Sequence, residues 1–326
     1  MTVKNEVLHI LEENKGKNIS GQELANILCV SRTAIWKAIK SLQQEGYLIN
    51  AASNKGYSLS YTSDVISSEG IRLFLCEKFK NIPISVYKSL SSTNTEAKAE
   101  IIQKGIHGTV VISEEQTNGR GRFGRKFFSP PNTGIYMSII LKPNLNISNS
   151  VLITTAAAVA VCLAIDKFTE KKPQIKWVND IYIENKKICG ILTEAVTDFE
   201  SGTIDSIVIG IGLNVKTENK TFPNELQEIA GSILQDNDNF AIRNKLTAEI
   251  INNVLSTCEK LEEKKFLKIY KERSMILGEN IFYKKNNKWI EGYAQDIDEN
   301  GGLIVSQNDG QQIILKSGEV SIRKTK

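Results

Sequence analysis

The fold of the N-terminal region is decided by residues 20–46, SGQELANILCVSRTAIWKAIKSLQQEG, which carry two helix starts and one helix stop in close succession. Ser20 and Ser31 are of the residue type that caps the start of a helix, and Gly46 is typical of a helix end. The two residues before Ser31 leave room only for a short turn. This order of signals predicts a helix-turn-helix.

The second helix of this motif has two chemically different faces. Ile35, Ala38, Ile39 and Leu42 recur at helical spacing and predict the buried face. The opposite face mixes basic side chains with a hydroxyl and an indole. Such a mixture favours DNA binding, with lysines on phosphates, although helix-turn-helix units also serve as protein-binding domains. The candidate DNA-binding residues are Ser31, Arg32, Thr33, Trp36, Lys37 and Lys40.

The residues before and after this motif predict an α+β protein of three domains. A length of 326 residues agrees with this number of domains. A helix precedes the motif, and a hairpin with expected strands at residues 47–49 and 57–59 follows it, so residues 1–62 are expected to form a winged helix-turn-helix DNA-binding domain. Helix and strand signals alternate over residues 63–272, which predicts a central mixed-sheet ligand-binding domain. Short strands between turn clusters then predict a small SH3-like β-barrel at residues 273–326.

Composition limits the classes of function. Apolar residues make up 41% and charged residues 24%, which is ordinary for a globular protein. A net charge of +4, from 41 basic and 37 acidic residues, is too even for a chain that binds polyanions over its whole surface. The five cysteines are far apart and the only histidines are His9 and His107, so neither a metal site nor a disulfide framework is predicted.

No membrane association is expected. A long uncharged stretch, residues 148–165, has 13 apolar positions, fewer than the ~20 that span a bilayer. A buried, alanine-rich helix is the better interpretation. The first residues contain no apolar segment typical of a signal peptide, so a cytoplasmic location is expected.

A loop rich in glycine and arginine, QTNGRGRFGRK at residues 116–126, contains the pattern G-x-G-x-x-G. A dinucleotide site would require a helix directly afterwards, and Pro130 and Pro131 forbid one. A kinase loop would require H-R-D and D-F-G elements, and neither is present. A cationic loop suited to phosphate or carboxylate remains, expected to be disordered until a nucleotide-like polyanion binds. The alternatives are a solvated basic loop and a second nucleic-acid contact.

A second cluster combines KWVND at residues 176–180 with KICGIL at residues 187–192. A hairpin between these runs would bring Asn179, Asp180 and Lys187 to one end of the sheet, with Gly190 leaving space beside Lys187. Taken separately, the lysine could be a solvated charge and the Asn-Asp pair a turn. Residues 206–215 then predict a central strand whose glycines admit a ligand or another part of the chain.

Four motifs in this order resemble biotin protein ligases: the loop GRGRFGR at residues 119–125, the two runs above, and GIGLN at residues 210–214. The N-terminal helix-turn-helix narrows the resemblance to the bifunctional ligases that also repress biotin operons. The resemblance implies that biotin and Mg-ATP give biotinyl-5'-adenylate, from which a lysine of a carboxylase biotin carrier domain takes the biotinyl group. It also implies an adenylate-bound homodimer on operator DNA that represses genes of biotin synthesis and transport.

The resemblance also assigns residues. The catalytic cations would be Arg122 and Lys187, with ATP and Mg²⁺ as co-substrate and no tightly bound metal. Biotin would contact Ser92, Thr93, Asn94, Gln116, Gly119, Arg120, Gly121, Arg122, Lys187 and Gly190. The nucleotide would contact Arg122, Arg125, Phe127, Asn179, Asp180, Asn214 and Arg323.

Three positions depart from the family pattern. Val178 stands where proline is usual, Phe123 where a polar or basic residue is frequent, and Phe127 where tryptophan is usual. These changes are expected to affect nucleotide affinity more than the type of reaction. Two other interpretations are a lipoate protein ligase and a ligand-sensing transcription factor without enzymatic activity.

Overall fold

The computed structural model describes residues 2–52, 55–103, 105–142, 150–197, 204–234, 241–285, 288–316, 318 and 320–322. The chain divides into two compact units. The first consists of Met1–Lys80 with Asn237–Glu249, and the second of Asn81–Asp236 with Ile250–Lys326.

The first unit contains the predicted helix-turn-helix. Its elements are α1 (Val3–Glu13), α2 (Gly21–Ile27), α3 (Arg32–Gln44), β1 (Ile49–Ala52), β2 (Gly56–Leu59), α4 (Ser68–Arg72) and the 3₁₀ helix η1 (Glu77–Phe79). Ser20 Oγ accepts from Glu23 N at 3.0 Å and Ser31 Oγ from Ala34 N at 3.2 Å, so both predicted caps are present. Gly46 follows α3 with φ +100°, a conformation that favours glycine.

The hairpin differs from the prediction in its first strand. We expected this strand over residues 47–49, but β1 begins only at Ile49. Tyr47 is buried, and its N–H donates to Leu42 O, so this residue closes the end of α3. β1 and β2 pair antiparallel, and part of the turn between them, including Asn54, lies outside the described residues.

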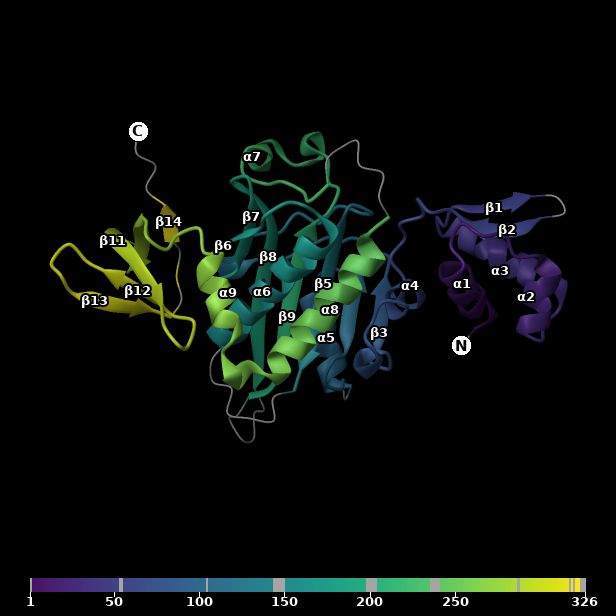
Figure 1. The fold of residues 1–326 in the computed structure, drawn as a ribbon, viewed down its shortest axis with the longest axis horizontal. Helices are drawn as coiled ribbons and strands as arrows, with labels where there is room; N and C mark the ends of the chain where they lie inside the picture. Colours follow the sequence, from purple (N-terminus) through teal and green to yellow (C-terminus); the bar gives the residue numbers. More distant parts are fainter. Residues whose placement is uncertain are drawn as a thin grey trace. The chain divides into compact units, whose positions relative to one another are not determined.

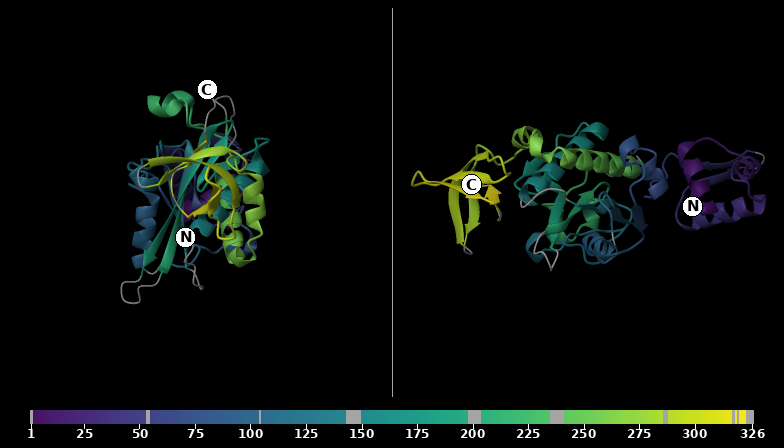
Figure 2. Two further views of the ribbon diagram at one scale, coloured as in Figure 1. Left: turned by 90° about the vertical axis from the view of Figure 1, so that its left-hand side faces the viewer. Right: turned by 90° about the horizontal axis from the view of Figure 1, so that it is seen from below.

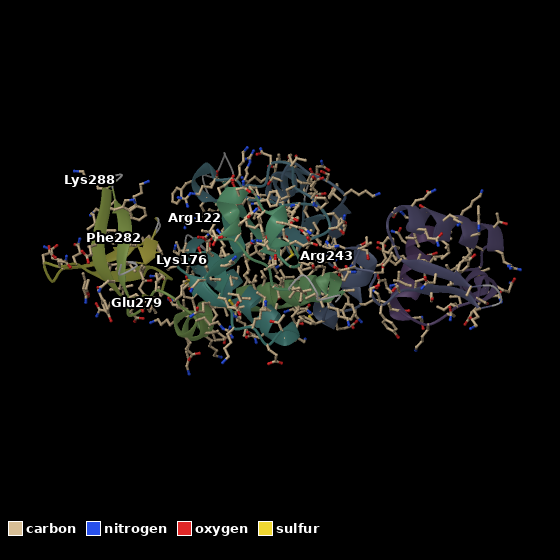
Figure 3. All side chains as sticks on the ribbon, turned by 90° about the horizontal axis from the view of Figure 1, so that it is seen from above. Arg122, Lys176, Arg243, Glu279, Phe282 and Lys288 are labelled. Atoms are coloured by element: carbon tan, nitrogen blue, oxygen red, sulfur yellow. The ribbon has the colours of Figure 1, made fainter. Side chains whose placement is uncertain are left out.

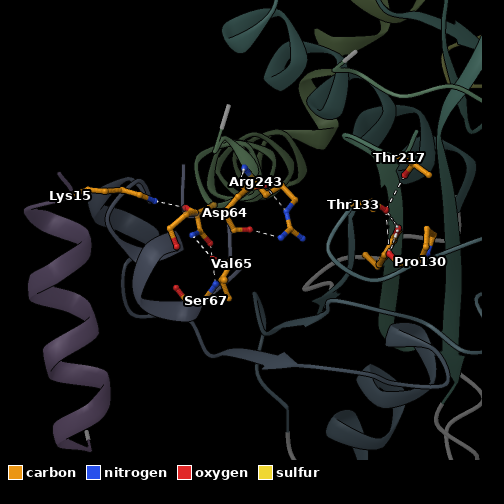
Figure 4. Close-up of polar contacts among 11 residues, drawn as sticks. Lys15, Asp64, Val65, Ser67, Pro130, Thr133, Thr217 and Arg243 are labelled. Atoms are coloured by element: carbon orange, nitrogen blue, oxygen red, sulfur yellow. Dashed lines mark hydrogen bonds and ion pairs between the residues drawn. The ribbon is translucent and has the colours of Figure 1, made fainter. Parts of the chain in front are cut away.

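A buried ion pair joins two distant segments of the first unit (Figure 4). Arg243, at the start of α8 (Arg243–Glu259), is 1% exposed, and its Nε lies 3.0 Å from Asp64 Oδ2. Asn244 adds two bonds, accepting from Ser67 N at 3.0 Å and donating to Val65 O at 2.9 Å. The first turn of α8 is therefore tied to the segment that follows the hairpin.

The second unit is built around a seven-stranded mixed sheet in the order β3-β4-β5-β9-β8-β7-β6 (Figure 1). β3 and β4 are parallel, and the other neighbours are antiparallel. The strands are β3 (Ile84–Tyr87), β4 (Val110–Ser113), β5 (Gly134–Leu141), β6 (Gln174–Lys176), β7 (Asp180–Ile183), β8 (Lys186–Thr197) and β9 (Ile204–Asn214). The glycine-containing strand predicted at residues 206–215 is β9, at the middle of the sheet.

Helices cover both faces of this sheet (Figure 2). Thr193 on β8 accepts from Thr154 of α6 (Ser150–Phe168) at 2.7 Å, whereas the next residue, Glu194, contacts Asn94 and Lys98 of α5 (Thr93–Ile102). Neighbouring residues of a strand point to opposite faces, so α5 and α6 lie on opposite sides. The other helices of this unit are η2 (Arg122–Gly124), η3 (Asn219–Thr221), α7 (Asn224–Gln227), η4 (Leu261–Glu263) and α9 (Phe266–Glu272), with α8 against α6.

The apolar stretch predicted as a core helix is α6. Its residues Val151–Phe168 are long and apolar enough to cross a membrane, but 72% of this window is buried inside the protein. Ala156, Ala157, Ala158 and Ala160 are fully buried. The prediction of a buried alanine-rich helix is confirmed.

The C-terminal part of the second unit is a five-stranded antiparallel sheet in the order β13-β12-β11-β10-β14. Its strands are β10 (Asn280–Lys285), β11 (Lys288–Ile297), β12 (Leu303–Ser306), β13 (Gln312–Leu315) and β14 (Val320–Ile322). Trp177 Nε1 donates to Gly301 O at 3.0 Å, and Lys271 Nζ lies 2.8 Å from Asp296 Oδ1, which attaches this sheet to the central one. The α+β fold class is confirmed, and the domain boundaries at residues 62 and 272 stay predictions.

Candidate functional site

A cavity of about 450 Å³ opens on the α5 side of the central sheet. It brings together most of the residues that the sequence analysis singled out from five separate segments. Those that line it are Ser92, Thr93, Asn94, Gln116, Arg120, Gly121, Arg122, Arg125, Phe127, Asn179, Asp180, Lys187, Gly190 and Asn214. Gly119 does not line the cavity, and Arg323 lies outside the described residues.

Three glycines make room for the side chains of the cavity wall. A Cβ atom on Gly210 would lie 2.2 Å from Asn94 Oδ1, and one on Gly212 would lie 2.5 Å from the Phe127 ring. A Cβ on Gly190 would lie 3.3 Å from Lys187 Cε, as expected from the sequence. The strand glycines therefore admit side chains of the protein itself into the site.

The loop at residues 116–128 is a narrow hairpin, whereas we expected it to have no structure before a ligand binds. Gly121 N donates to Arg125 O at 2.7 Å, and Phe127 N donates to Gly119 O at 2.9 Å. A Cβ atom on Gly119 would lie 2.4 Å from Phe127 O, which explains a glycine there. These backbone hydrogen bonds define the hairpin.

The end of this loop is fixed to the sheet by hydroxyl groups (Figure 4). Thr133 Oγ1 donates to Pro130 O at 3.3 Å and accepts from Thr217 Oγ1 at 3.0 Å. Tyr136 OH also donates to Pro130 O, at 3.0 Å. These bonds attach the end of the loop at Pro130 to β5 and to the segment that contains Thr217.

One end of the cavity is strongly cationic. Over the whole cavity, the described lining contains the cations Arg120, Arg122, Arg125, Lys126, Lys176 and Lys187 but only one carboxylate, Asp180. Lys187 Nζ lies 2.7 Å from Asp180 Oδ1, and Arg122 Nη1 donates to Asn179 Oδ1 at 3.2 Å. The predicted convergence of Asn179, Asp180 and Lys187 is confirmed. Arg122 and Lys176 are labelled in Figure 3.

A segment after α7 passes beside Lys187. Lys187 N donates to Ile229 O at 2.8 Å, and Gly231 N donates to Lys187 O at 2.9 Å. Asn214 Nδ2 donates to Gly231 O at 3.0 Å, whereas its buried Oδ1 has no hydrogen-bond partner among the described residues. Asn214 Oδ1 is therefore an acceptor available to a ligand.

The other end of the cavity is neutral and polar. Thr93 N donates to Gln116 Oε1 at 2.9 Å, and Gln116 Nε2 donates to Ser129 Oγ at 3.0 Å. Ser92 occupies the N-cap position of α5, and its hydroxyl makes no capping bond. This end presents neutral hydrogen-bonding groups, held by a helix start and by the loop.

Comparison with known proteins identifies the family. Sequence profiles match the biotin/lipoate A/B protein ligase family at residues 86–214, an HTH domain at residues 3–58 and the biotin protein ligase C-terminal domain at residues 276–323. The bifunctional ligase/repressor BirA of Bacillus subtilis is 32% identical over 317 residues, covering 95% of each chain. The chain belongs to the BirA family of bifunctional ligase/repressors. The Escherichia coli BirA protein is 27% identical and covers 94% of each chain.

A solved member of the biotin protein ligases supports the same fold. The Aquifex aeolicus enzyme in complex with biotin and ATP superimposes with a TM-score of 0.62 at 26% identity. The match covers 74% of this chain and 99% of that chain.

Some lining residues were not foreseen. Trp289 of the C-terminal sheet is 50% exposed and lines the cavity, but nothing in its local sequence distinguishes it from a surface residue.

Lys176 belongs to the run KWVND, and its Nζ lies 5.9 Å from the centre of the Tyr182 ring, which also lines the cavity. Burial, together with the charge of Asp180, raises the pKa of Tyr182 to about 12, so this phenol is neutral at pH 7.

The BirA family assignment gives the first unit a second candidate site on α3. Its buried face consists of Ile35, Ala38, Ile39 and Leu42, as predicted. The residues predicted to contact DNA, namely Ser31, Arg32, Thr33, Trp36, Lys37 and Lys40, are all exposed. Trp36 is 52% exposed, which is unusual for an indole without a binding role.

Proposed function

We propose that this chain is an ATP-dependent biotin protein ligase that forms biotinyl-5'-AMP and transfers biotin to a lysine of a carboxylase biotin carrier domain. One observation carries the proposal: the lining of a single cavity combines neutral hydrogen-bonding side chains with six cations. A uniformly cationic site would suit a phosphate alone. A cavity with both neutral and cationic groups suits the neutral ring and the carboxylate of biotin together with the phosphates of ATP.

The arrangement can neutralise the charges that meet in the first reaction. A biotin carboxylate oxygen attacks the α-phosphorus of ATP and pyrophosphate leaves, so two anions must approach one another. Arg122 and Lys187, which are proposed to be catalytic, stand on the same cationic wall as Arg120. In the second step the carrier lysine amine attacks the acyl carbon and AMP leaves. Neither step requires a protein nucleophile, and catalysis consists of positioning and charge stabilisation.

The remaining assignments follow the two ends of the cavity. Biotin is proposed to contact Ser92, Thr93, Asn94, Gln116, Arg120, Gly121, Arg122, Lys187 and Gly190, while Gly119 shapes the loop. The nucleotide is proposed to contact Arg122, Arg125, Phe127, Asn179, Asp180, Asn214 and Arg323. The free acceptor Asn214 Oδ1 supports its place in this set.

Magnesium is proposed to enter with ATP. Mg²⁺ is usually held by one or two carboxylates together with substrate phosphates. Among the described lining residues Asp180 is the one carboxylate. A single carboxylate fits an ion that the nucleotide phosphates mainly carry, and Asp180 would hold that ion in the cavity. The magnesium ion would neutralise part of the phosphate charge. The ion pair between Lys187 and Asp180 keeps the lysine next to this carboxylate.

The test is biotin-dependent exchange of radiolabelled pyrophosphate into ATP, with lipoate as the competing substrate. Exchange with biotin and not with lipoate supports the proposal, and mass spectrometry should then find one biotin adduct on a carrier domain. Exchange with lipoate alone would favour a lipoate ligase. If neither acid supports exchange, the chain is a transcription factor without the ligase reaction.

We also propose that biotinyl-5'-AMP makes this cytoplasmic protein a dimeric repressor of genes for biotin synthesis and transport. The exposed cations and Trp36 on α3 support DNA contact, and a dimer would align two such helices on a two-fold operator. In a gel-shift titration, biotin plus ATP should strengthen binding to such an operator. The proposal is contradicted if the operator affinity and the sedimentation coefficient stay unchanged on adding both ligands.

A further inference from the structure

Behind the neutral end of the cavity lies a row of hydrogen-bonded side chains. Ser138 on β5 is fully buried, and its Oγ lies 2.6 Å from Asn94 Oδ1 and 2.8 Å from Thr93 Oγ1. On β8, Glu194 Oε2 accepts from Asn94 Nδ2 at 2.7 Å, and Glu194 Oε1 accepts from Lys98 Nζ at 2.6 Å. Ser138, Glu194 and Lys98 do not line the cavity, so any effect on a ligand must pass through Asn94 and Thr93.

Glu194 is ionised at neutral pH. Burial by itself raises the pKa of this carboxyl group. The hydrogen bonds from Lys98 and Asn94, with the charges of Lys98 and Arg120, outweigh burial and lower the pKa below its ordinary value. An ionised carboxylate can only accept hydrogen bonds.

This carboxylate determines how the amide of Asn94 is oriented. The NH₂ group must face Glu194, and its second hydrogen is directed to Leu192 O, 3.3 Å from Nδ2. Leu192 O and the Glu194 carboxylate can only accept hydrogen bonds, so the amide oxygen of Asn94 is turned toward Ser138. Gly210 provides the space that the oxygen occupies.

The orientation of the amide then sets the direction of the next hydrogen bonds. Ser138 has one hydroxyl proton, and the Asn94 oxygen can only accept, so Ser138 donates to Asn94. The proton of Thr93 can then go to either of two acceptors, because Thr93 Oγ1 lies 2.8 Å from Ser138 Oγ and 3.2 Å from Gln116 Oε1. In either case the Asn94 oxygen keeps a second lone pair and can accept one more hydrogen bond.

We propose that Glu194, held by Lys98, is a positioning residue that makes the neutral end of the cavity present acceptors to the ring N–H groups of the ligand. The inference rests on the proposed function, because the ureido ring of biotin carries two such N–H donors. A ligand that lacks one N–H would lose a partner at this wall. Glu194 would thus contribute to selectivity without touching the ligand.

The substitution Glu194→Gln should invert this pattern. The ammonium group of Lys98 has only donors, so it would take the amide oxygen of Gln and leave the Gln NH₂ group facing Asn94. Asn94 would then have to turn its oxygen toward position 194 and its NH₂ group toward Ser138. The cavity wall would then present the N–H donors of Asn94 to the N–H donors of the ligand ring.

The inversion is tested by calorimetry of biotin binding and by exchange kinetics. Loss of a well-placed hydrogen bond costs roughly 1.5 kcal/mol, so we expect Glu194→Gln to raise the biotin Kd and KM about 10-fold or more. The KM for ATP and kcat at saturating biotin should stay within about twofold of the parent, since Arg122 keeps its bond to Asn179 and Lys187 its ion pair with Asp180. The preference for biotin over biotin methylated on a ring nitrogen should shrink as well.

Lys98→Met supplies a control and a rescue. By itself it should change biotin binding little, because Glu194 remains an acceptor. Combined with Glu194→Gln it should restore at least part of the lost affinity, because Gln can then rotate and accept from Asn94. Glu263→Gln, which removes a carboxylate from an exposed ion pair with Lys265, is the matched charge control.

The outcomes separate the inference from the proposed function. If the parent binds biotin and Glu194→Gln has the parent's Kd and selectivity, or if the double variant binds no better than Glu194→Gln, the inference is wrong. If Glu194→Gln fails to fold, Glu194→Ala gives a second test, because it also removes the acceptor that orients the Asn94 amide and should likewise raise the biotin Kd. A parent that binds biotin without pyrophosphate exchange refutes the ligase function but leaves the Kd comparison decisive.

Discussion

The two ends of the cavity are built in opposite ways. The cationic end depends largely on a loop, with Arg120, Arg122 and Arg125 on a hairpin closed by its own backbone bonds. The neutral end depends on the start of α5 and on two central strands, where buried side chains bond one another. Under the proposed function, selectivity for the ligand ring would then reside on a helix start and two strands, whereas much of the charge for the reaction would come from a loop.

The largest expected effect is at the cationic end. Lys187→Ala removes the cation paired with Asp180, and we expect a loss of about 10²- to 10³-fold in the rate of pyrophosphate exchange. The neighbouring Lys186→Ala is the control, because Lys186 Nζ donates to Gln227 O and does not line the cavity. A loss below tenfold for Lys187→Ala would show that this end does not stabilise the reacting charges.

Arg122→Gly should lower kcat/KM for exchange by about 10- to 100-fold, because it removes a cation and its bond to Asn179. It should also leave the loop more open to proteolysis between residues 116 and 128 when biotin and ATP are present. Limited proteolysis with and without both ligands measures this difference. Equal cleavage in parent and variant would contradict an adjustable loop.

Two glycine substitutions can separate the ends from one another. Gly210→Ala forces its new methyl group against Asn94, and Gly212→Ala forces one against Phe127. Each should weaken one ligand by about tenfold, since overpacking costs on the order of 1–3 kcal/mol. Gly210→Ala should raise the KM for biotin and Gly212→Ala the KM for ATP. If each variant raises both constants equally, the two ends do not act separately.

The smallest effect is expected outside the cavity. Lys37→Ala on α3 should weaken operator binding roughly threefold to tenfold and reduce the salt dependence by about one phosphate contact. Pyrophosphate exchange should remain at the parent rate, because α3 belongs to the first compact unit and the cavity to the second. Gel shifts at several salt concentrations measure the slope. An unchanged slope would remove Lys37 from the DNA contacts.

The sequence predicts the local elements well, because caps, glycines and strand patterns are local signals. The helix-turn-helix, the buried α6 and the hairpin that brings Lys187 to Asp180 were all predicted from neighbouring residues. Trp289 and Glu194 were not predicted, because both reach the site through partners far away in the sequence. Asn94 and Glu194 are 100 residues apart, and no periodicity marks such a pair. The loop was expected to be disordered because its charge is visible in the sequence and its backbone bonds are not.

The Asp64–Arg243 pair limits how the helix-turn-helix unit can be exchanged between members of this family. The two residues are 179 positions apart, and the segment that contains Arg243 belongs to the same compact unit as the helix-turn-helix. A chimera that grafts only residues 1–80 would leave one charge of the pair behind, and breaking a buried pair costs about 3–5 kcal/mol. A working transplant must carry residues 237–249 as its second half.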